Sequence, residues 1–127
     1  MALTKTISTI QSNVTVAANT LGAASTGVDL SGAVDFGIGY KMTFNGSATL
    51  GAVIELYADP EGAAVDFTVG AYDDPADAGD VAVDAGHQAR GFVPLNRSAK
   101  YVKAKVRNLD TGQSITGIYL YATVQAP

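Results

Sequence analysis

The sequence has no cysteine and no tryptophan among its 127 residues, and only 16% of them are charged. Without cysteine, the chain forms no disulfide, no thiolate nucleophile and no zinc site with sulfur ligands. No apolar run approaches the ~20 residues of a membrane span. The opening "MALTKTISTIQS" lacks the apolar stretch of a signal peptide. We therefore expect a soluble protein that is not exported by the usual route. Scarce surface charge favours a subunit buried in an assembly.

Apolar and polar residues alternate along most of the chain, and this period of two is typical of β-strands. No segment keeps a helical apolar period for three turns. Gly, Asn, Asp and Pro bound the alternating stretches. The pattern predicts strands at 13–19, 34–44, 50–58, 64–72, 79–86, 88–95, 100–108 and 115–124. Seven to nine antiparallel strands in one domain predict an all-β sandwich of the jelly-roll kind.

Turn residues indicate how some of these strands connect. Pro60 to Gly62 predicts a hairpin of 50–58 with 64–72, and "LDTGQS" at 109–114 predicts a hairpin of 100–108 with 115–124. The glycines of "FGIGYK" lie inside a strand pattern, where they allow a bulge or close packing. The Thr- and Ser-rich residues 1–12 are expected to be an N-terminal arm, and residues 13–127 the sandwich domain.

Charge is distributed unevenly along a chain whose net charge is −4. Nine of the twelve acids lie between Glu55 and Asp84, and six of the eight bases lie between Arg90 and Arg107. On the predicted closing hairpin, aromatic and basic side chains share one face. These candidate protein contacts are Tyr101, Lys103, Lys105, Arg107, Tyr119 and Tyr121. The alternative is that they only cover the sheet through cross-strand pairs. Nucleic acid is the least favoured partner, because an isoelectric point near 4.6 repels phosphate.

The segment "AYDDPADAGDVAVDAG" at 71–86 holds five carboxylates and no base. Carboxylate oxygens are ligands for Ca²⁺, so a calcium loop is one interpretation. The spacing does not follow an EF-hand, and a solvated connection is the favoured interpretation. The ligands of the calcium alternative are Asp73, Asp74, Asp77, Asp80 and Asp84. No other metal site and no cofactor are expected.

Catalysis has little support in these residues. His87 is the single histidine, and "DAGHQARG" around it predicts a surface position at a strand end. Glu55 and Glu61 are the only glutamates, one in a strand and the other in a turn, whereas a glycosidase needs two carboxyl groups placed across a cleft. We therefore expect no catalytic residue and a protein that is not an enzyme.

Three segments resemble the small β-sandwich proteins that tailed bacteriophages encode near their major capsid protein. They are "SNVTVAANTLGAASTGVDLSG", "AVIELYADPEGAAVDFTVG" and "SAKYVKAKVRNLDTGQSITGIYLYATVQ". The resemblance implies a virion protein assembled in the host cytoplasm, either a decoration (cement) protein of the head or another head or tail attachment protein. It also implies binding to the major capsid protein or other virion proteins, and a homo-oligomer, with a trimer favoured. No membrane partner is expected.

Two function classes remain open at this stage. The first is the virion structural protein. The second is a carbohydrate- or calcium-binding module that uses the acidic segment and the exposed tyrosines Tyr57, Tyr72, Tyr119 or Tyr121.

Overall fold

The computed structural model describes residues 2–30, 32–58, 77–94 and 101–127, and within these residues every regular element is a strand. The strands are β1 (Thr4–Val16), β2 (Val28–Asp29), β3 (Asp35–Phe44), β4 (Ala52–Ala58), β5 (Asp77–Val81), β6 (Gln88–Pro94), β7 (Tyr101–Asn108) and β8 (Ile115–Ala126). This result confirms the all-β prediction and the expected number of strands. The predicted strand 64–72 lies outside the described residues.

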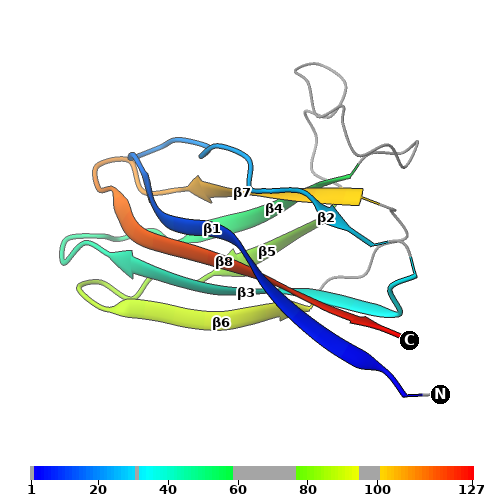
Figure 1. Ribbon diagram of the computed structural model, residues 1–127. Helices are drawn as coiled ribbons and strands as arrows, with labels where there is room; N and C mark the ends of the chain where they lie inside the picture. The colour runs from blue at the N-terminus through cyan, green and yellow to red at the C-terminus, as the bar shows by residue number, and fades with distance from the viewer. Residues whose placement is uncertain (1, 31, 59–76, 95–100) are drawn as a thin grey trace.

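The strands form two sheets of four, with the order β1-β8-β3-β6 in sheet A and β2-β7-β4-β5 in sheet B. Figure 1 shows the two sheets as layers, with β7 and β2 in one and β8, β3 and β6 in the other. β1 pairs with β8, β2 with β7, β3 with β6 and β4 with β5, all antiparallel. This nesting is what a long hairpin gives when it is rolled into two layers. The sandwich is therefore a jelly roll, as predicted.

The core lies between the two sheets and is built by the alternate residues that the sequence pattern places inward. Ile38 and Met42 of β3 face Ile54 and Leu56 of β4 across this core, and all four are nearly inaccessible to solvent. From β7 and β8 come Val102, Ala104, Val106, Ile118, Leu120 and Ala122. Burial of this apolar surface is the main force that holds the two sheets together.

One predicted connection is wrong. β7 pairs with β2 and β4, whereas β8 pairs with β1 and β3, so 100–108 and 115–124 do not form a hairpin. Residues 109–114 instead cross from sheet B to sheet A. The predicted partner 64–72 of β4 lies outside the described residues, and β4 pairs with β5 and β7.

Two buried polar side chains hold the crossing segment 109–114 in place. The Asn108 amide donates to the carbonyls of Ala17 and Gln113, at 3.2 and 2.7 Å. The Asp110 carboxylate accepts backbone N–H bonds from Thr49 at 2.7 Å and Gly112 at 2.9 Å. These bonds satisfy buried polar groups and explain why "LDTGQS" does not close a tight turn.

Residues 4–12, which the sequence assigns to an arm, lie in β1 and pair with β8. The strand continues through the predicted domain boundary at residue 13, with register shifts between Thr9 and Gln11 and again up to Val16. Asn13 takes a positive φ of 50° within this irregular stretch. Residues 4–9 are exposed, and burial begins at Ile10.

Candidate interaction surfaces

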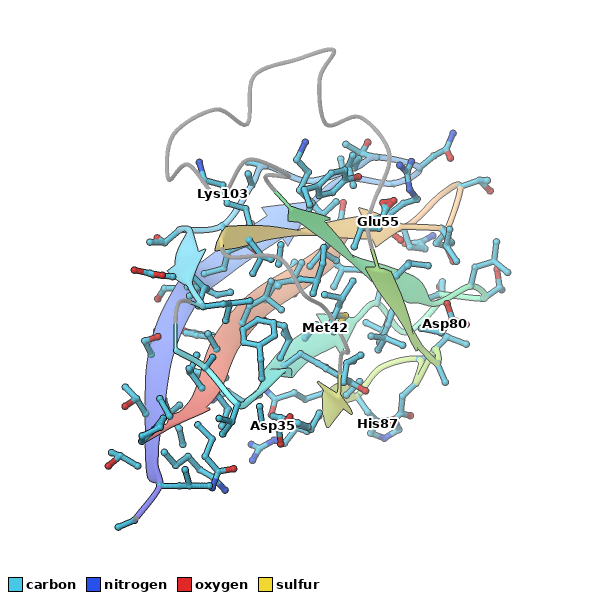
Figure 2. The ribbon with its side chains drawn as sticks, turned by 90° about the vertical axis from the view of Figure 1, so that its right-hand side faces the viewer. Asp35, Met42, Glu55, Asp80, His87 and Lys103 are labelled. Atoms are coloured by element: carbon cyan, nitrogen blue, oxygen red, sulfur yellow. The ribbon has the colours of Figure 1, made fainter. Side chains whose placement is uncertain are left out.

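The six predicted contact residues do not share one face, because β7 and β8 lie in different sheets. Lys103, Lys105 and Arg107 point outward from sheet B, whereas Tyr119 and Tyr121 point outward from sheet A. In Figure 2, Lys103 of β7 and Asp35 of β3 lie on opposite sides of the sandwich, with Met42 between them. Tyr101 begins β7, but its side chain lies outside the described residues.

On sheet B, two of the basic side chains bind groups of the same sheet. Arg107 Nε donates to Glu55 Oε2 at 3.0 Å, and Lys105 Nζ lies 4.6 Å from the centre of the Tyr57 ring. The register makes both of them diagonal pairs: Arg107 lies opposite Val53, two residues before Glu55, and Lys105 lies opposite Glu55, two residues before Tyr57. Contacts within the subunit therefore partly neutralise the charge of Arg107 and partly satisfy that of Lys105.

The same cluster shifts two pKa values. Burial, followed by the charge of the Glu55 carboxylate, raises the pKa of the Tyr57 phenol. The hydrogen bond with Glu55 raises the pKa of Arg107. Tyr57 is only 1% exposed, and its hydroxyl lies 3.4 Å from Glu55 Oε2. On sheet B, the polar groups of Glu55, Tyr57, Lys105 and Arg107 thus bind mainly one another, and they do not form a free basic surface.

The outer face of sheet A is different, because it combines exposed apolar rings with cations. The β3 and β6 registers place Gly39 beside both Tyr121 and Phe92, and Lys41 beside both Tyr119 and Arg90. The Tyr119 and Tyr121 rings are stacked within 9° of parallel, with centres 6.4 Å apart. Lys41 Nζ lies 4.9 Å from the Tyr119 ring centre. We call this surface the aromatic face; its residues are Ile7, Lys41, Arg90, Phe92, Tyr119 and Tyr121.

Two glycines allow the Phe92 ring to lie across sheet A. A Cβ atom at Gly37 would come 2.2 Å from Phe92 Cζ, so any larger residue there would displace the ring. At Gly39 the nearest ring atom would be 3.7 Å away. This arrangement confirms the prediction of close packing at "FGIGYK". Phe92 nevertheless stays 53% exposed and Ile7 65% exposed.

The cations of the aromatic face are not neutralised by carboxylates of the described residues. Arg90 Nε donates to the neutral amide oxygen of Gln88 at 2.7 Å, and Lys41 contacts tyrosine rings. The ion pair of Arg107 with Glu55 and the contact of His87 with Asp84 both lie elsewhere in the described residues. The aromatic face is thus a cationic, apolar patch on a protein of net charge −4.

The residues of the calcium alternative are only partly visible. Asp73 and Asp74 lie outside the described residues, and Asp77 begins β5. Asp80 is exposed on β5, and Asp84 lies 3.1 Å from Nδ1 of His87, which is exposed just before β6 as predicted. Within the described ranges, no three His, Asp or Glu residues are close enough to hold a metal ion. No helix in those ranges has the length and apolar character to cross a membrane.

Some residues of the aromatic face were missed by sequence reasoning. Lys41, Phe92 and Ile7 lie far apart in the chain, and only the strand order brings them to one face. The signal that was available is their position on the polar side of an alternating strand, where a large apolar residue such as Phe92 is unexpected.

No family model and no curated protein sequence matches the chain. Among solved structures, it is similar to the Bacillus endospore appendages, described as a family of disulfide-linked pili, with 14% identity and a TM-score of 0.48. That match covers 98% of this chain and 87% of the other. It is also similar to dimeric latent PorU from Porphyromonas gingivalis, with 10% identity and a TM-score of 0.58. This chain spans only 13% of the PorU chain, although 99% of it is covered, and the likeness shows a shared fold alone.

Proposed function

We propose that the protein is a non-enzymatic structural subunit that binds other proteins of a larger assembly through its outer surfaces. The aromatic face is the observation that supports this most directly. Interface centres are enriched in Tyr, Phe and Arg, and a few such residues supply most of the binding energy. Phe92, Tyr119, Tyr121 and Arg90 form such a group on a rigid sheet. Lys41 and Arg90 favour a partner surface that is acidic around an apolar centre.

The assembly that we propose is the head of a tailed bacteriophage, with this protein as a decoration or other head-associated protein. The strand segments that resemble phage head proteins support this proposal, and both solved structures named above come from other kinds of protein. A jelly roll with an exposed sheet face fits the role, because it presents a rigid surface to a repeating lattice.

The test is immunogold electron microscopy of particles pelleted from lysates of cells that express the gene in its native context. We expect gold label on the heads. Particles without label would overturn the virion assignment. Binding of purified protein to heads from which this protein has been removed then tests the surface. Replacing Phe92 and Tyr121 with Ser should weaken binding by roughly tenfold or more, since each hot-spot residue contributes about 2 kcal/mol.

A matched control replaces Leu109 and Val83 with Ser. Both are exposed apolar residues, at 40% and 37%, outside the aromatic face. Their variant should bind as the wild type does. Equal losses for both variants would mean that general surface hydrophobicity, and not the aromatic face, governs binding.

The carbohydrate-binding alternative has one supporting observation, the parallel rings of Tyr119 and Tyr121. Aromatic rings in such an array can stack on sugar rings through their apolar faces. Affinity electrophoresis in gels containing neutral or acidic polysaccharides tests it. Retardation that disappears in the Tyr121→Ser variant would favour a carbohydrate partner over a protein.

A further inference from the structure

The lateral edges of the two sheets are not equally protected against pairing with another strand. Edge strands of natural proteins are usually short, charged or interrupted by proline. β2 has 2 residues, β5 has 5 residues with Asp77 and Asp80, and β6 contains Arg90 and Pro94. β1, in contrast, is a 13-residue edge strand with no proline and a single charge, Lys5. Figure 1 shows β1 as the outermost strand of its sheet.

The backbone groups that β1 turns outward can be identified from the strand order. In an antiparallel sheet, alternate residues bond to opposite neighbours. Phe44 N–H donates to the His87 carbonyl, so the even residues of β3 bond to β6 and the odd ones to β8. The bond from Val34 N–H to the Gln125 carbonyl agrees, because it turns Gln125 toward β3.

The even residues of β8 therefore bond to β1, at Thr4, Thr6 and Ser8. The N–H and C=O groups of Lys5, Ile7 and Thr9 point to the open side. None of the described residues pairs with β1 on that side between Thr4 and Thr9. Beyond Thr9 the edge is covered, because Thr26 N–H donates to the Ile10 carbonyl at 3.0 Å.

We propose that this open edge pairs with the same edge of a second copy of the chain. In the antiparallel arrangement, Ile7 lies opposite Ile7 of the second copy, and Lys5 lies opposite Thr9 of the second copy. The six outward N–H and C=O groups of Lys5, Ile7 and Thr9 on each copy are then all paired. Two isoleucines, each 65% exposed in the single subunit, cover one another, which is a favourable cross-strand pair.

Other registers are less favourable. A pairing centred on Lys5 places two ammonium groups opposite each other, which is destabilising. A pairing centred on Thr9 extends onto Ile10 and Gln11, where residues 23–26 already lie against β1. A pairing centred on Thr6 sets Ile7 against a lysine, and one centred on Ser8 sets Ile7 against Thr9, so both forfeit the contact between the two isoleucines. The register centred on Ile7 avoids all three costs.

The pairing has a consequence for the aromatic face. A two-fold axis between antiparallel edges stands perpendicular to the sheet, so the joined sheets A keep their outer faces on the same side. The dimer would present two aromatic faces to one partner surface, which raises its avidity. The dimer itself is inferred from the edge alone and does not depend on the proposed function.

The absence of native cysteine makes a cross-linking test direct. Residues opposite each other in a hydrogen-bonded antiparallel pair have Cα atoms about 5.5 Å apart, within reach of a disulfide. Purified Ile7→Cys protein should therefore form a covalent dimer on mild oxidation. Thr9→Cys is the matched control: it is also exposed on the same edge but lies opposite lysine. Equal cross-linking of the two variants, or preferential cross-linking of Thr6→Cys, would overturn the proposal.

A second pair of variants measures the non-covalent dimer by light scattering and sedimentation equilibrium. Ile7→Pro removes an N–H that points away from β8, so the subunit should stay folded while the concentration-dependent dimer is lost. Thr6→Pro removes an N–H bonded to β8 and should lower the melting temperature. A wild-type chain that stays monomeric up to about 1 mM, or an Ile7→Pro variant that associates as the wild type does, would refute the pairing. These measurements use purified protein alone, so their outcome is separate from that of the particle labelling.

Discussion

The Asp110 carboxylate accepts a hydrogen bond from the backbone N–H of Thr49, 61 positions earlier in the chain, at 2.7 Å. The same carboxylate accepts bonds from Leu50, Gly112 and Gln113. It thereby ties the segment that crosses between the sheets to the residues that lead into β4.

These backbone N–H bonds, with that from Thr49 the strongest, lower the pKa of Asp110 from 3.8 to about 2. Because the folded state holds the proton less tightly than the unfolded state, this carboxylate stabilises the fold fully above about pH 4. The contribution is lost as the pH falls through about 2. We expect Asp110→Asn to lower the melting temperature at pH 7, and the difference from wild type to shrink between pH 4 and pH 2. Calorimetry at several pH values measures this.

The control for that series is Asp84→Asn. Asp84 is an exposed acid whose side chain contacts only His87 among the described groups. Its replacement should change the melting temperature little at any of these pH values. A difference for Asp110→Asn that is constant across the pH range would contradict the role of its carboxylate charge.

Glu55 and Arg107 should be energetically coupled. The Glu55 side chain is 7% exposed and that of Arg107 43%, so water screens the pair only in part. In a double-mutant cycle with Glu55→Gln and Arg107→Met, we expect a coupling energy of about 1 kcal/mol. Urea unfolding of the four proteins measures it. Additive effects of the two changes would show that the pair is no more than a surface contact.

Tyr57 should ionise at a higher pH than a free tyrosine. Burial raises its pKa, and the Glu55 charge adds to this shift. Because the pKa of Tyr57 is higher in the folded than in the unfolded protein, the neutral phenol is compatible with full stability of the fold below about pH 10. The free energy of unfolding then falls as the pH rises from 10 through the raised pKa. Absorbance titration at alkaline pH should show a late component that Tyr57→Phe removes. If Tyr57→Phe removes an early component instead, the phenol is not shielded.

Gly117 should tolerate a side chain less well than Gly46. Gly117 has a φ of +57° in β8, close to the register shift opposite Lys41 and Thr43. Alanine in this left-handed conformation costs roughly 1–2 kcal/mol. A Cβ atom at Gly46 would meet no atom within 4 Å, so Gly46→Ala should change stability by less than about 0.5 kcal/mol. Chemical denaturation of both variants compares them, and equal losses would count against the backbone explanation.

Leu56 and Leu50 form a matched pair for the core. Leu56 is 1% exposed between the sheets, and Leu50 is 48% exposed before β4. Leu56→Ala should destabilise the fold by about 2–5 kcal/mol, because it removes buried methyl groups and leaves a cavity. Leu50→Ala should cost far less. The free energy of unfolding of each variant, measured in denaturant, tests this prediction. A small loss of stability for Leu56→Ala would mean that the neighbouring core side chains move in to fill the cavity.

The fold class could be predicted because the period of two survives in nearly every strand. Alternation alone puts Ile38, Ile54 and Leu120 on the apolar side of their strands, and all three are buried. β2 was not predicted, since two residues carry no periodicity. β1 was predicted to begin at residue 13, because its first six residues are polar except for Ile7; all six are exposed.

The pairing of β7 and β8 could not be predicted from alternation. Both strands alternate in the same way whether they are neighbours in one sheet or face each other across the core. The turn-like segment between them favoured the first option. The deciding groups are the buried side chains of Asn108 and Asp110, whose partners are remote in sequence. Because the pairing of β7 and β8 was wrong, the predicted contact surface also differs from the observed one. Tyr119 and Tyr121 lie beside Lys41 and Phe92 on sheet A, and not beside Lys105 and Arg107 of sheet B.

The nesting of strand pairs also constrains how the chain reaches its native state. β1 and β8 are the first and last strands, and they lie side by side for most of the length of β1. During synthesis β1 has no partner strand until β8 has left the ribosome, because β8 separates it from β3. The early chain therefore exposes an unpaired strand for most of translation, and closing such long-range contacts is slow. We expect the emergence of β8 from the ribosome, rather than growth of the strands before it, to limit the rate of folding in the cell.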